Sequence, residues 1–354
     1  MKKFFIYIFL FLFFFVFGST IAYASGSKHY SYKQIKRDLS GKPAVINVFT
    51  VNPKCIDVTI KPSYASQSIG NLRRVQDIAF AENALAAVNA SYFKPDIGVP
   101  LGASIIDRKV ITGPLYNRVV FGITGNNDFK MAKLKLNGKI FVGKDIELPI
   151  FNINQPVFSN VSFSLFTPEW GIDTPKTSSY YTHIVVDNYK IQSVSSDSVQ
   201  IPPNGFVIVG PKKLLPETYN CGDLVFYETY LSPDDWFDVV NAVGGGPYLV
   251  KEGSIFIDKQ RFGKDFLWEK EPRTAVGYTK KGTLILATVD GRSKNSYGAT
   301  LTELAKIMYD LGAYNAMNLD GGTSTQMVVN GRVVNTPTIK GGAKVTNALI
   351  IKLK

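Results

Sequence analysis

Two aspartates, each followed by a glycine, stand at the ends of two apolar runs and are the main candidates for chemistry. Asp290 follows the run that ends at Val289, and Asp320 comes 30 residues later, directly after Leu319. A predicted helix separates the two runs. Because a strand–helix–strand crossover brings both strand ends to one edge of a sheet, we expect the two carboxylates to lie close together. Paired carboxylates can flank and hydrolyse a glycosidic bond.

The residues after Asp320 have the composition of a ligand-binding loop. Gly321 and Gly322 have no Cβ, so their consecutive N–H groups can approach an anion and form a nest. Thr323 and Ser324 add hydroxyl donors. The loop is therefore predicted to hold a charged or hydroxyl-rich ligand.

Other residues can complete a pocket around the two aspartates. Arg273 and Arg292 can bind a phosphate through paired N–H donors. Further walls can come from the glycine cluster with Gly245 and Gly246, and from the polar and aromatic segment with Asn89 and Tyr92.

Each candidate also has a structural interpretation. Asp-Gly is a common turn, so either aspartate can be a turn residue, and Asp290 can also be an arginine partner. The arginines can pair with the aspartates, the glycine cluster can form a bulge or corner, and Asn89 can cap a loop. His183 alternates along a strand and is interpreted as structural.

The elements that must position these residues are mostly short strands. β-type runs are predicted at 44–50, 56–60, 85–88, 119–124, 184–187, 206–209, 223–230, 284–289 and 346–351. Hairpin turns are predicted at Asn137-Gly138, Asn330-Gly331, Asp187-Asn188 and Lys280-Lys281-Gly282. Helical spacing predicts helices only over 71–82 and 300–311.

Glu303 and Thr300 form a predicted capping box, which explains Glu303 without catalysis. The sequence predicts an α+β fold: a single large domain over 44–354, built on a mixed, mostly antiparallel sheet with few helices.

The N-terminus has the layout of an export signal. Lys2 and Lys3 precede an apolar run over 4–17, and Ala22-Tyr23-Ala24 fits a cleavage site. The run of about 14 residues is shorter than the about 20 needed to span a membrane, although an uncleaved anchor is the alternative. We expect a signal peptide over 1–24, a loose polar leader over 25–43, and an exported protein, whether extracellular, periplasmic or at the cell surface.

Composition excludes several classes of protein. The 354 residues are 45% hydrophobic and 19% charged, so disorder is excluded. Two histidines and two cysteines exclude a cysteine-rich zinc module. The formal net charge of +12 is dispersed rather than clustered, so nucleic-acid binding is not expected. The excess of basic residues suits an anionic envelope polymer or a lipid surface, and the alternative is merely a soluble basic exported protein. Pairing of Cys55 with Cys221 is left open.

At these residues the chain resembles the phosphodiester glycosidase family, whose animal member, the "uncovering" enzyme, removes N-acetylglucosamine from a glycosyl phosphodiester. The resemblance covers roughly residues 85–352, and its most specific part is Leu319-Asp320-Gly321-Gly322. Two departures are Thr323, where many relatives have a third glycine, and Lys344, where an arginine is often found. The other matching segments are 89–93, 245–250, 273–277, 289–292, 298–312, 335–337 and 347–351.

The resemblance implies a bacterial, exported hydrolase of carbohydrate metabolism that cleaves a sugar 1-phosphodiester. It also implies functional roles for Asn89, Arg273, Asp290, Arg292 and the loop 320–324. Bacterial relatives are often associated with exopolysaccharide in the cell envelope. The expected partner is a phosphodiester-linked glycan or glycolipid, with the membrane involved only through the export signal.

Three functions are therefore weighed. In the first, Asp320 is base or nucleophile, Asp290 its partner, Arg273 and Arg292 hold the phosphate, and Asn89 and Tyr92 contact the sugar. The second is non-catalytic binding or assembly of an anionic polysaccharide. The third is a metal-dependent phosphoesterase, in which Asp290, Asn318 and Asp320 bind Ca²⁺ through oxygen. The sequence requires no cofactor, and metal need, the sugar, the aglycone, the stereochemical outcome and the oligomeric state stay open.

Overall fold

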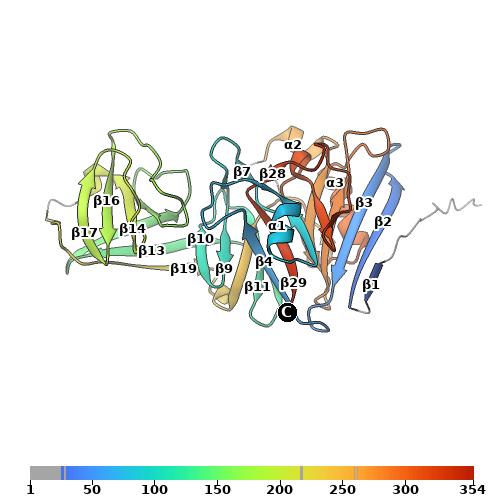
Figure 1. The fold of residues 1–354 in the computed structure, drawn as a ribbon, viewed down its shortest axis with the longest axis horizontal. Coiled ribbons are helices and arrows are strands. Elements are labelled where there is room, and N and C mark those ends of the chain that lie inside the picture. The colour runs from blue at the N-terminus through green and yellow to red at the C-terminus, as the bar shows by residue number, and fades with distance from the viewer. Residues whose placement is uncertain (1–24, 28, 216–217, 259, 261) are drawn as a thin grey trace, which may run out of the picture.

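The computed structural model describes residues 25–27, 29–215, 218–258, 260 and 262–354. Strands dominate and helices are few and short, as the sequence predicts (Figure 1). The helices are α1 (Val75–Ala81), α2 (Lys264–Trp268) and α3 (Leu301–Asp310), with 3-10 turns η1 (Lys212–Leu214), η2 (Asp234–Trp236) and η3 (Gly322–Ser324). The predicted signal peptide lies outside the described residues. Within them, no helix is both long enough and apolar enough to cross a membrane.

An eight-stranded antiparallel sheet carries the residues predicted for chemistry. Along its central strand β24, Leu284 and Leu286 face one side, while Ile285 and Ala287 face the other. Both faces are therefore buried, which explains the unbroken apolar run. In spatial order the strands are β1 (Ser25–Ser27), β2 (Tyr30–Asp38), β3 (Pro43–Val51), β24 (Leu284–Val289), β23 (Arg273–Tyr278), β25 (Asn315–Asn318), β21 (Tyr248–Lys251) and β22 (Ser254–Ile255).

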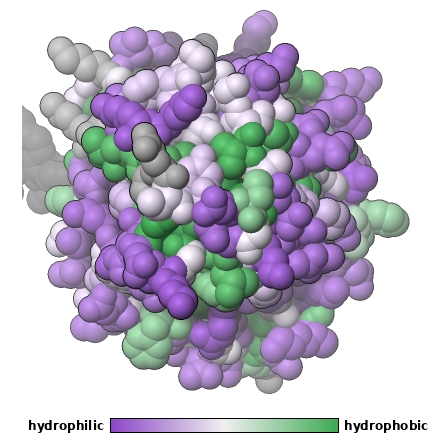
Figure 2. All heavy atoms as spheres, turned by 90° about the vertical axis from the view of Figure 1, so that its left-hand side faces the viewer, coloured by the Kyte–Doolittle hydropathy of each residue, from purple (hydrophilic) through white to green (hydrophobic). Residues whose placement is uncertain are grey.

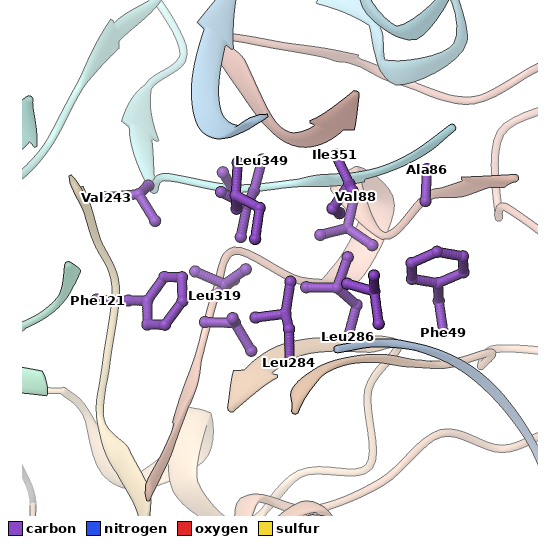
Figure 3. Packing of buried hydrophobic residues seen from close by; sticks show 14 of the residues in the cluster. Phe49, Ala86, Val88, Phe121, Val243, Leu284, Leu286, Leu319, Leu349 and Ile351 are labelled. Carbon is purple, nitrogen blue, oxygen red and sulfur yellow. The ribbon is translucent and has the colours of Figure 1, made fainter. Parts of the chain in front are cut away.

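A five-stranded sheet stacks on this sheet, and the main core lies between the two. Figure 3 shows Phe49, Leu284 and Leu286 of the larger sheet packed against Val88 and Leu349 of the smaller one. Helices α2 and α3 cover the far face of the larger sheet, and α1 covers the far face of the smaller. The result is four layers. The smaller sheet contains β27 (Arg332–Val333), β26 (Met327–Val329), β6 (Ala86–Asn89), β29 (Asn347–Leu353) and β4 (Val58–Tyr64).

A second five-stranded sheet closes one side of this core. Its residues Phe121 and Val243 point into the same cluster (Figure 3). It consists of β10 (Lys109–Thr112), β9 (Ser104–Ile106), β20 (Val239–Gly244), β11 (Val119–Thr124) and β12 (Phe129–Lys133). Two short pairs complete this region: β28 (Lys344–Val345) with β5 (Arg73–Arg74), and β7 (Phe93–Lys94) with β8 (Val99–Pro100).

A seven-stranded sheet projects from the layered body at the left of Figure 1 and has its own apolar core. Figure 2 shows its outer end, where hydrophobic and hydrophilic side chains alternate over the surface. One pair, β14 with β15, is parallel, so the sheet is mixed. The strands are β17 (Lys190–Ser195), β16 (Tyr181–Asp187), β18 (Gly205–Pro211), β15 (Phe163–Phe166), β14 (Ile146–Ile153), β13 (Lys135–Val142) and β19 (Val225–Ser232).

Two local predictions were wrong. Residues 30–38 are not a loose leader but strand β2, because β3 offers an edge and the Tyr32 hydroxyl donates to Asn47 Oδ1 at 2.9 Å. Asn137-Gly138 is not a turn but lies inside β13. There the glycine permits close approach, since a Cβ on Gly138 would be 2.3 Å from the Glu228 carbonyl oxygen.

Other local predictions are confirmed. Asn330-Gly331 joins β26 to β27, and residues 188–189 join β16 to β17. Helix α3 begins with the predicted capping box, in which Thr300 Oγ1 accepts from the Glu303 N–H at 3.1 Å and Glu303 Oε2 accepts from the Thr300 N–H at 2.9 Å. Helix α1 starts later than predicted because residues 73–74 pair with β28.

Candidate active site

The two Asp-Gly strand ends meet on either side of Pro272. Strand β23 lies between β24 and β25 and is antiparallel to both, so β24 and β25 run parallel and end at one edge, as predicted. A Cβ on Gly291 would lie 2.7 Å from Pro272 N, and one on Gly321 would lie 2.8 Å from Pro272 O. These close approaches explain why glycine follows each aspartate.

Asp320 is a partly exposed carboxylate on a fixed backbone. Leu319 before it points into the core (Figure 3), whereas the Asp320 carboxylate accepts from the Gly321 N–H at 2.9 Å. Burial raises the pKa of Asp320 to about 6, against the opposing effects of the Ser324 hydroxyl, the Gly321 N–H and the charge of Arg118. A carboxyl with this pKa can take up or release a proton near neutral pH, as a general acid or base must.

Arg118 acts on this carboxylate through its charge and was not singled out from the sequence. Its guanidinium carbon lies 4.3 Å from the ring centroid of Phe262, 5.0 Å from that of Tyr92 and 5.1 Å from that of Tyr116. Its Nε and Nη1 are buried without a hydrogen-bond partner among the described residues. Burial lowers the pKa of Arg118, while Asp320 counteracts that effect. Buried N–H donors without a partner call for a ligand, and an anion fits them.

The sequence carries only a faint signal for Arg118. Tyr116 and Asn117 have φ of 57° and 54°, so the chain makes a tight turn immediately before β11 and presents the next side chain to the site. Residues 114–118 contain a proline and an asparagine, which mark a turn. A turn does not reveal that an arginine there meets a strand end about 200 residues later in the sequence.

The ring of Tyr92 packs against the Arg118 guanidinium, and its hydroxyl is held by two hydrogen bonds. Its hydroxyl donates to the Gly246 carbonyl at 2.8 Å and accepts from Asn318 Nδ2 at 2.5 Å. A Cβ on Gly245 would lie 2.6 Å from the Asn318 carbonyl oxygen. The predicted glycine cluster therefore does join the site, because only glycine allows this corner to pack against the end of β25.

Asn89 contacts the backbone of Asp320 and is fully buried. Its Nδ2 donates to the Asp320 carbonyl at 2.6 Å, and its Oδ1 accepts from Thr274 Oγ1 at 2.7 Å and from the Gln326 N–H at 3.1 Å. Asn89 thus fixes the backbone of the aspartate. This geometry favours the interpretation as a loop-holding residue over the predicted contact with a sugar.

The two predicted arginines occupy different places. Arg273 is 2% exposed, and its Nε and Nη2 donate to the carbonyls of Ala299, Phe266 and Glu269 at 2.8–2.9 Å. These donors of Arg273 are therefore bound to backbone carbonyls at the end of α2 and just before α3. Arg292 is exposed, pairs with Glu271 at 2.7 Å, and has Nη2 3.5 Å from the position of a Cβ on Gly322. The Arg292 side chain borders the loop, whereas Arg273 approaches it only through its backbone, with its Cα 3.7 Å from the position of a Cβ on Gly321.

The loop itself is built differently from the predicted nest. The Gly321 N–H donates to Asp320 Oδ1, and the Gly322 N–H donates to the Pro272 carbonyl at 2.8 Å. Gly322 has φ of 59°, which glycine adopts without strain. Thr323 is exposed and Ser324 is buried beside the Asp320 carboxylate. The two glycine amides are therefore used inside the protein, whereas Arg118 offers buried donors that have no partner among the described residues.

Asp290 is at the predicted edge but is sealed from solvent, with 3% of its surface exposed. Its Oδ2 accepts from the Thr336 N–H at 3.1 Å, and its Oδ1 from Asn47 Nδ2 at 3.4 Å. Burial raises its pKa to about 6. The carboxyl holds the segment around residue 336 against β3, so the structure gives it a positioning geometry.

We expect Asp290 to make the stability of the protein depend on pH. Because its folded pKa lies above the ordinary 3.8, the carboxyl favours the folded state when protonated, and this contribution is lost as the pH rises from about 4 through 6. The unfolding free energy of the wild type, relative to that of Asp290→Asn, should fall by about 2–3 kcal/mol between pH 4 and pH 7.5. Urea unfolding at both pH values measures this difference. If the unfolding free energy changes equally with pH in the wild type and in Asp290→Asn, the prediction is contradicted.

Three remaining residues carry no chemistry in this arrangement. His183 is fully buried between Thr174 Oγ1 and Thr177 Oγ1, each at 2.9 Å, which confirms its structural interpretation. Cys55 and Cys221 are free and exposed. In the described part of the chain, no group of three or more His, Cys, Asp or Glu side chains gathers as a metal-binding cluster.

The comparisons with known proteins agree with the fold and the sequence pattern. Residues 180–352 match the family model of the phosphodiester glycosidases. N-acetylglucosamine-1-phosphodiester alpha-N-acetylglucosaminidase of Bos taurus is 32% identical over 124 residues, or 31% of this chain. The matched segment spans 23% of the length of that relative.

Two solved structures share the fold. A hypothetical protein from Synechocystis superposes with a TM-score of 0.85 at 24% identity, over 93% of this chain and 63% of that one. The catalytic domain of the zebrafish N-acetylglucosamine-1-phosphodiester alpha-N-acetylglucosaminidase, described as auto-inhibited by its pro-peptide, gives 0.57 at 20% identity, over 95% and 87%. These two likenesses show the fold alone. The match of residues 180–352 to the family model confirms the resemblance to the phosphodiester glycosidases that the sequence predicts.

Proposed function

We propose that the chain is a hydrolase that cleaves the bond between a sugar C1 and the phosphate oxygen of a glycosyl 1-phosphodiester. One observation carries the proposal: Asp320, with a pKa of about 6, lies within electrostatic reach of the Arg118 guanidinium, whose buried Nε and Nη1 have no partner among the described residues. A proton-transferring carboxyl beside a positively charged anion site is what this reaction requires. The family match over residues 180–352 supports this substrate class.

The proposed reaction divides between charge neutralisation and activation of a nucleophile. Arg118, with Arg292 at the rim, holds the phosphate as negative charge develops on the leaving oxygen. Asp320 takes a proton from water, the water oxygen forms a bond to C1, and the C1–O bond breaks with its electron pair going to the phosphomonoester. Because phosphate leaves readily, no second carboxyl is needed as an acid, which is consistent with the sealed position of Asp290.

Direct attack by Asp320 on C1 is the other route open to a lone carboxylate. It gives a covalent glycosyl intermediate and retention at C1, whereas activation of water gives inversion. The anomer formed first, read by proton NMR, distinguishes the routes.

Export and an envelope substrate belong to the same proposal. The signal-like layout of residues 1–24 and the net positive charge support an exported protein acting on an anionic glycan. Involvement of Ca²⁺ stays a question for the assay, which is run with and without a chelator.

The test uses purified protein, a series of sugar 1-phosphodiesters and water enriched in ¹⁸O. We expect free sugar and a phosphomonoester as products, with the label in the sugar. Label in the phosphate shows P–O cleavage and replaces the proposal by the phosphoesterase. Saturable binding without products over long incubation replaces it by the non-catalytic glycan binder.

A further inference from the structure

A cavity of about 510 Å³ opens where the projecting sheet joins the layered body, away from Asp320. The end of β19, turn η2 and the β9–β10 hairpin line it, and in Figure 1 β9 and β10 lie on the side of the layered body that faces the projecting sheet. Its volume is in the range of sites that bind small molecules. Asp320, Arg118 and Gly245 are absent from its lining.

Aromatic side chains around the cavity are exposed to an unusual degree. Phe237 is 82% exposed, Tyr230 59% and Tyr227 38%, and all three line the cavity with the buried Trp236. Large aromatic surfaces left in water at the mouth of a cavity mark a binding site rather than a core.

Charged side chains stand at the same mouth: Arg108 and Lys109 line the cavity, and so does Asp234. Asp107 and Arg108 form the two-residue turn of the β9–β10 hairpin, with φ of 48° and 69°, and this turn presents Arg108 to the cavity. Arg108 Nη1 donates to the Phe237 carbonyl at 3.2 Å, which holds the guanidinium at the backbone of that residue. Lys109 lines the same cavity while pairing with Glu169. Apolar ring faces next to a held guanidinium suit a ligand with both apolar faces and negative charge.

We propose that this cavity is a second binding site, which holds a phosphate-bearing segment of the glycan, with sugar rings against Phe237 and Tyr230 and phosphate at Arg108. The inference rests on the proposed function for the identity of the glycan. Strand β20 supports the link between the sites: it begins at Val239 in the cavity lining and ends at Gly244, directly before Gly245 of the candidate active site. Its six residues span about 20 Å, which sets the length of glycan that the inference requires to reach both sites.

Occupation of two sites by one chain raises apparent affinity for the polymer without changing the chemistry. Phe237→Ala, Tyr230→Ala and Arg108→Gln should therefore raise KM for a phosphodiester-linked polymer about tenfold and leave kcat unchanged. The same variants should hydrolyse a short sugar 1-phosphodiester as the wild type does. Phe80→Ala is the matched control, since Phe80 is 85% exposed on α1 and is outside the cavity lining.

The outcomes separate this inference from the proposed function. Loss of affinity for the polymer with intact turnover of the short substrate supports the second site. Unchanged KM for the polymer in all three variants overturns it, even if the enzyme is active. If the wild type turns over no substrate, direct binding of the polymer by calorimetry gives the same test: equal affinities of wild type and Phe237→Ala overturn the second site.

Discussion

Replacing Asp320 by asparagine is expected to lower kcat/KM for a sugar 1-phosphodiester by about 10²–10⁴-fold. The amide keeps the size of the side chain and can still accept from the Gly321 N–H, but it cannot take a proton from water. Since the pKa of Asp320 is about 6 and the base must be ionised, kcat/KM of the wild type should rise with pH through that value. The residual activity of Asp320→Asn should lack this rise.

Two controls keep the result specific. Asp290→Asn makes the same chemical change at the other strand end, and we expect it to retain far more activity because that carboxyl is sealed and bonded to Thr336. Unfolding midpoints show whether either variant has lost its structure. Full activity of Asp320→Asn, or an equal loss in both variants, contradicts the assignment of Asp320 as the base.

Replacing Arg118 by methionine should lower kcat/KM by about 10²–10³-fold. Methionine fills the aromatic cage of Tyr92 and Phe262 but removes the charge and the N–H donors that face the phosphate. Arg118→Lys keeps the charge without the paired donors, so we expect an intermediate loss. The measurement is steady-state kinetics on the same short substrate.

Arg118 also predicts a change in the pH profile. Its charge holds the pKa of Asp320 down, so without it that pKa rises and the rise in kcat/KM moves to higher pH. A merely structural role for Arg118 would not shift the profile. Arg332→Ala, at an exposed arginine on β27, serves as the control for loss of a positive charge. Unchanged kinetics in Arg118→Met would falsify its role at the phosphate.

Much of the fold could be predicted because it depends on local patterns. The apolar runs and Asp-Gly ends fixed the order of β24, α3 and β25, and the capping box at Thr300 located the start of α3. The projecting sheet could not be predicted, since its strands have the same short apolar runs as the body. What separates it is a different set of packing partners, which no local pattern contains.

Residue types suggested Asp320, its loop, Tyr92 and the glycine cluster, but they did not suggest Arg118 or the contacts between these parts. Asp320 and its loop came from one motif. Arg118 and Tyr92 reach it from elements more than 200 residues earlier, so their approach depends on how the sheets stack. Residue type alone suggested that the N–H donors of Arg273 and Asn89 are exposed to a ligand. In the structure these donors bind backbone carbonyls of the protein instead. Burial, which decides between the two uses, is a property of the whole fold.

The hydrogen bond from Asn89 to the Asp320 carbonyl crosses the interface between the two stacked sheets, because Asn89 ends β6 and Asp320 follows β25. The spacing of these layers therefore sets where the carboxylate stands relative to Arg118. A substitution deep between the layers, such as a smaller side chain at Leu286, can then alter turnover while leaving every residue near the substrate intact. Selection for activity should therefore also act on the buried side chains that set the distance between the two stacked sheets.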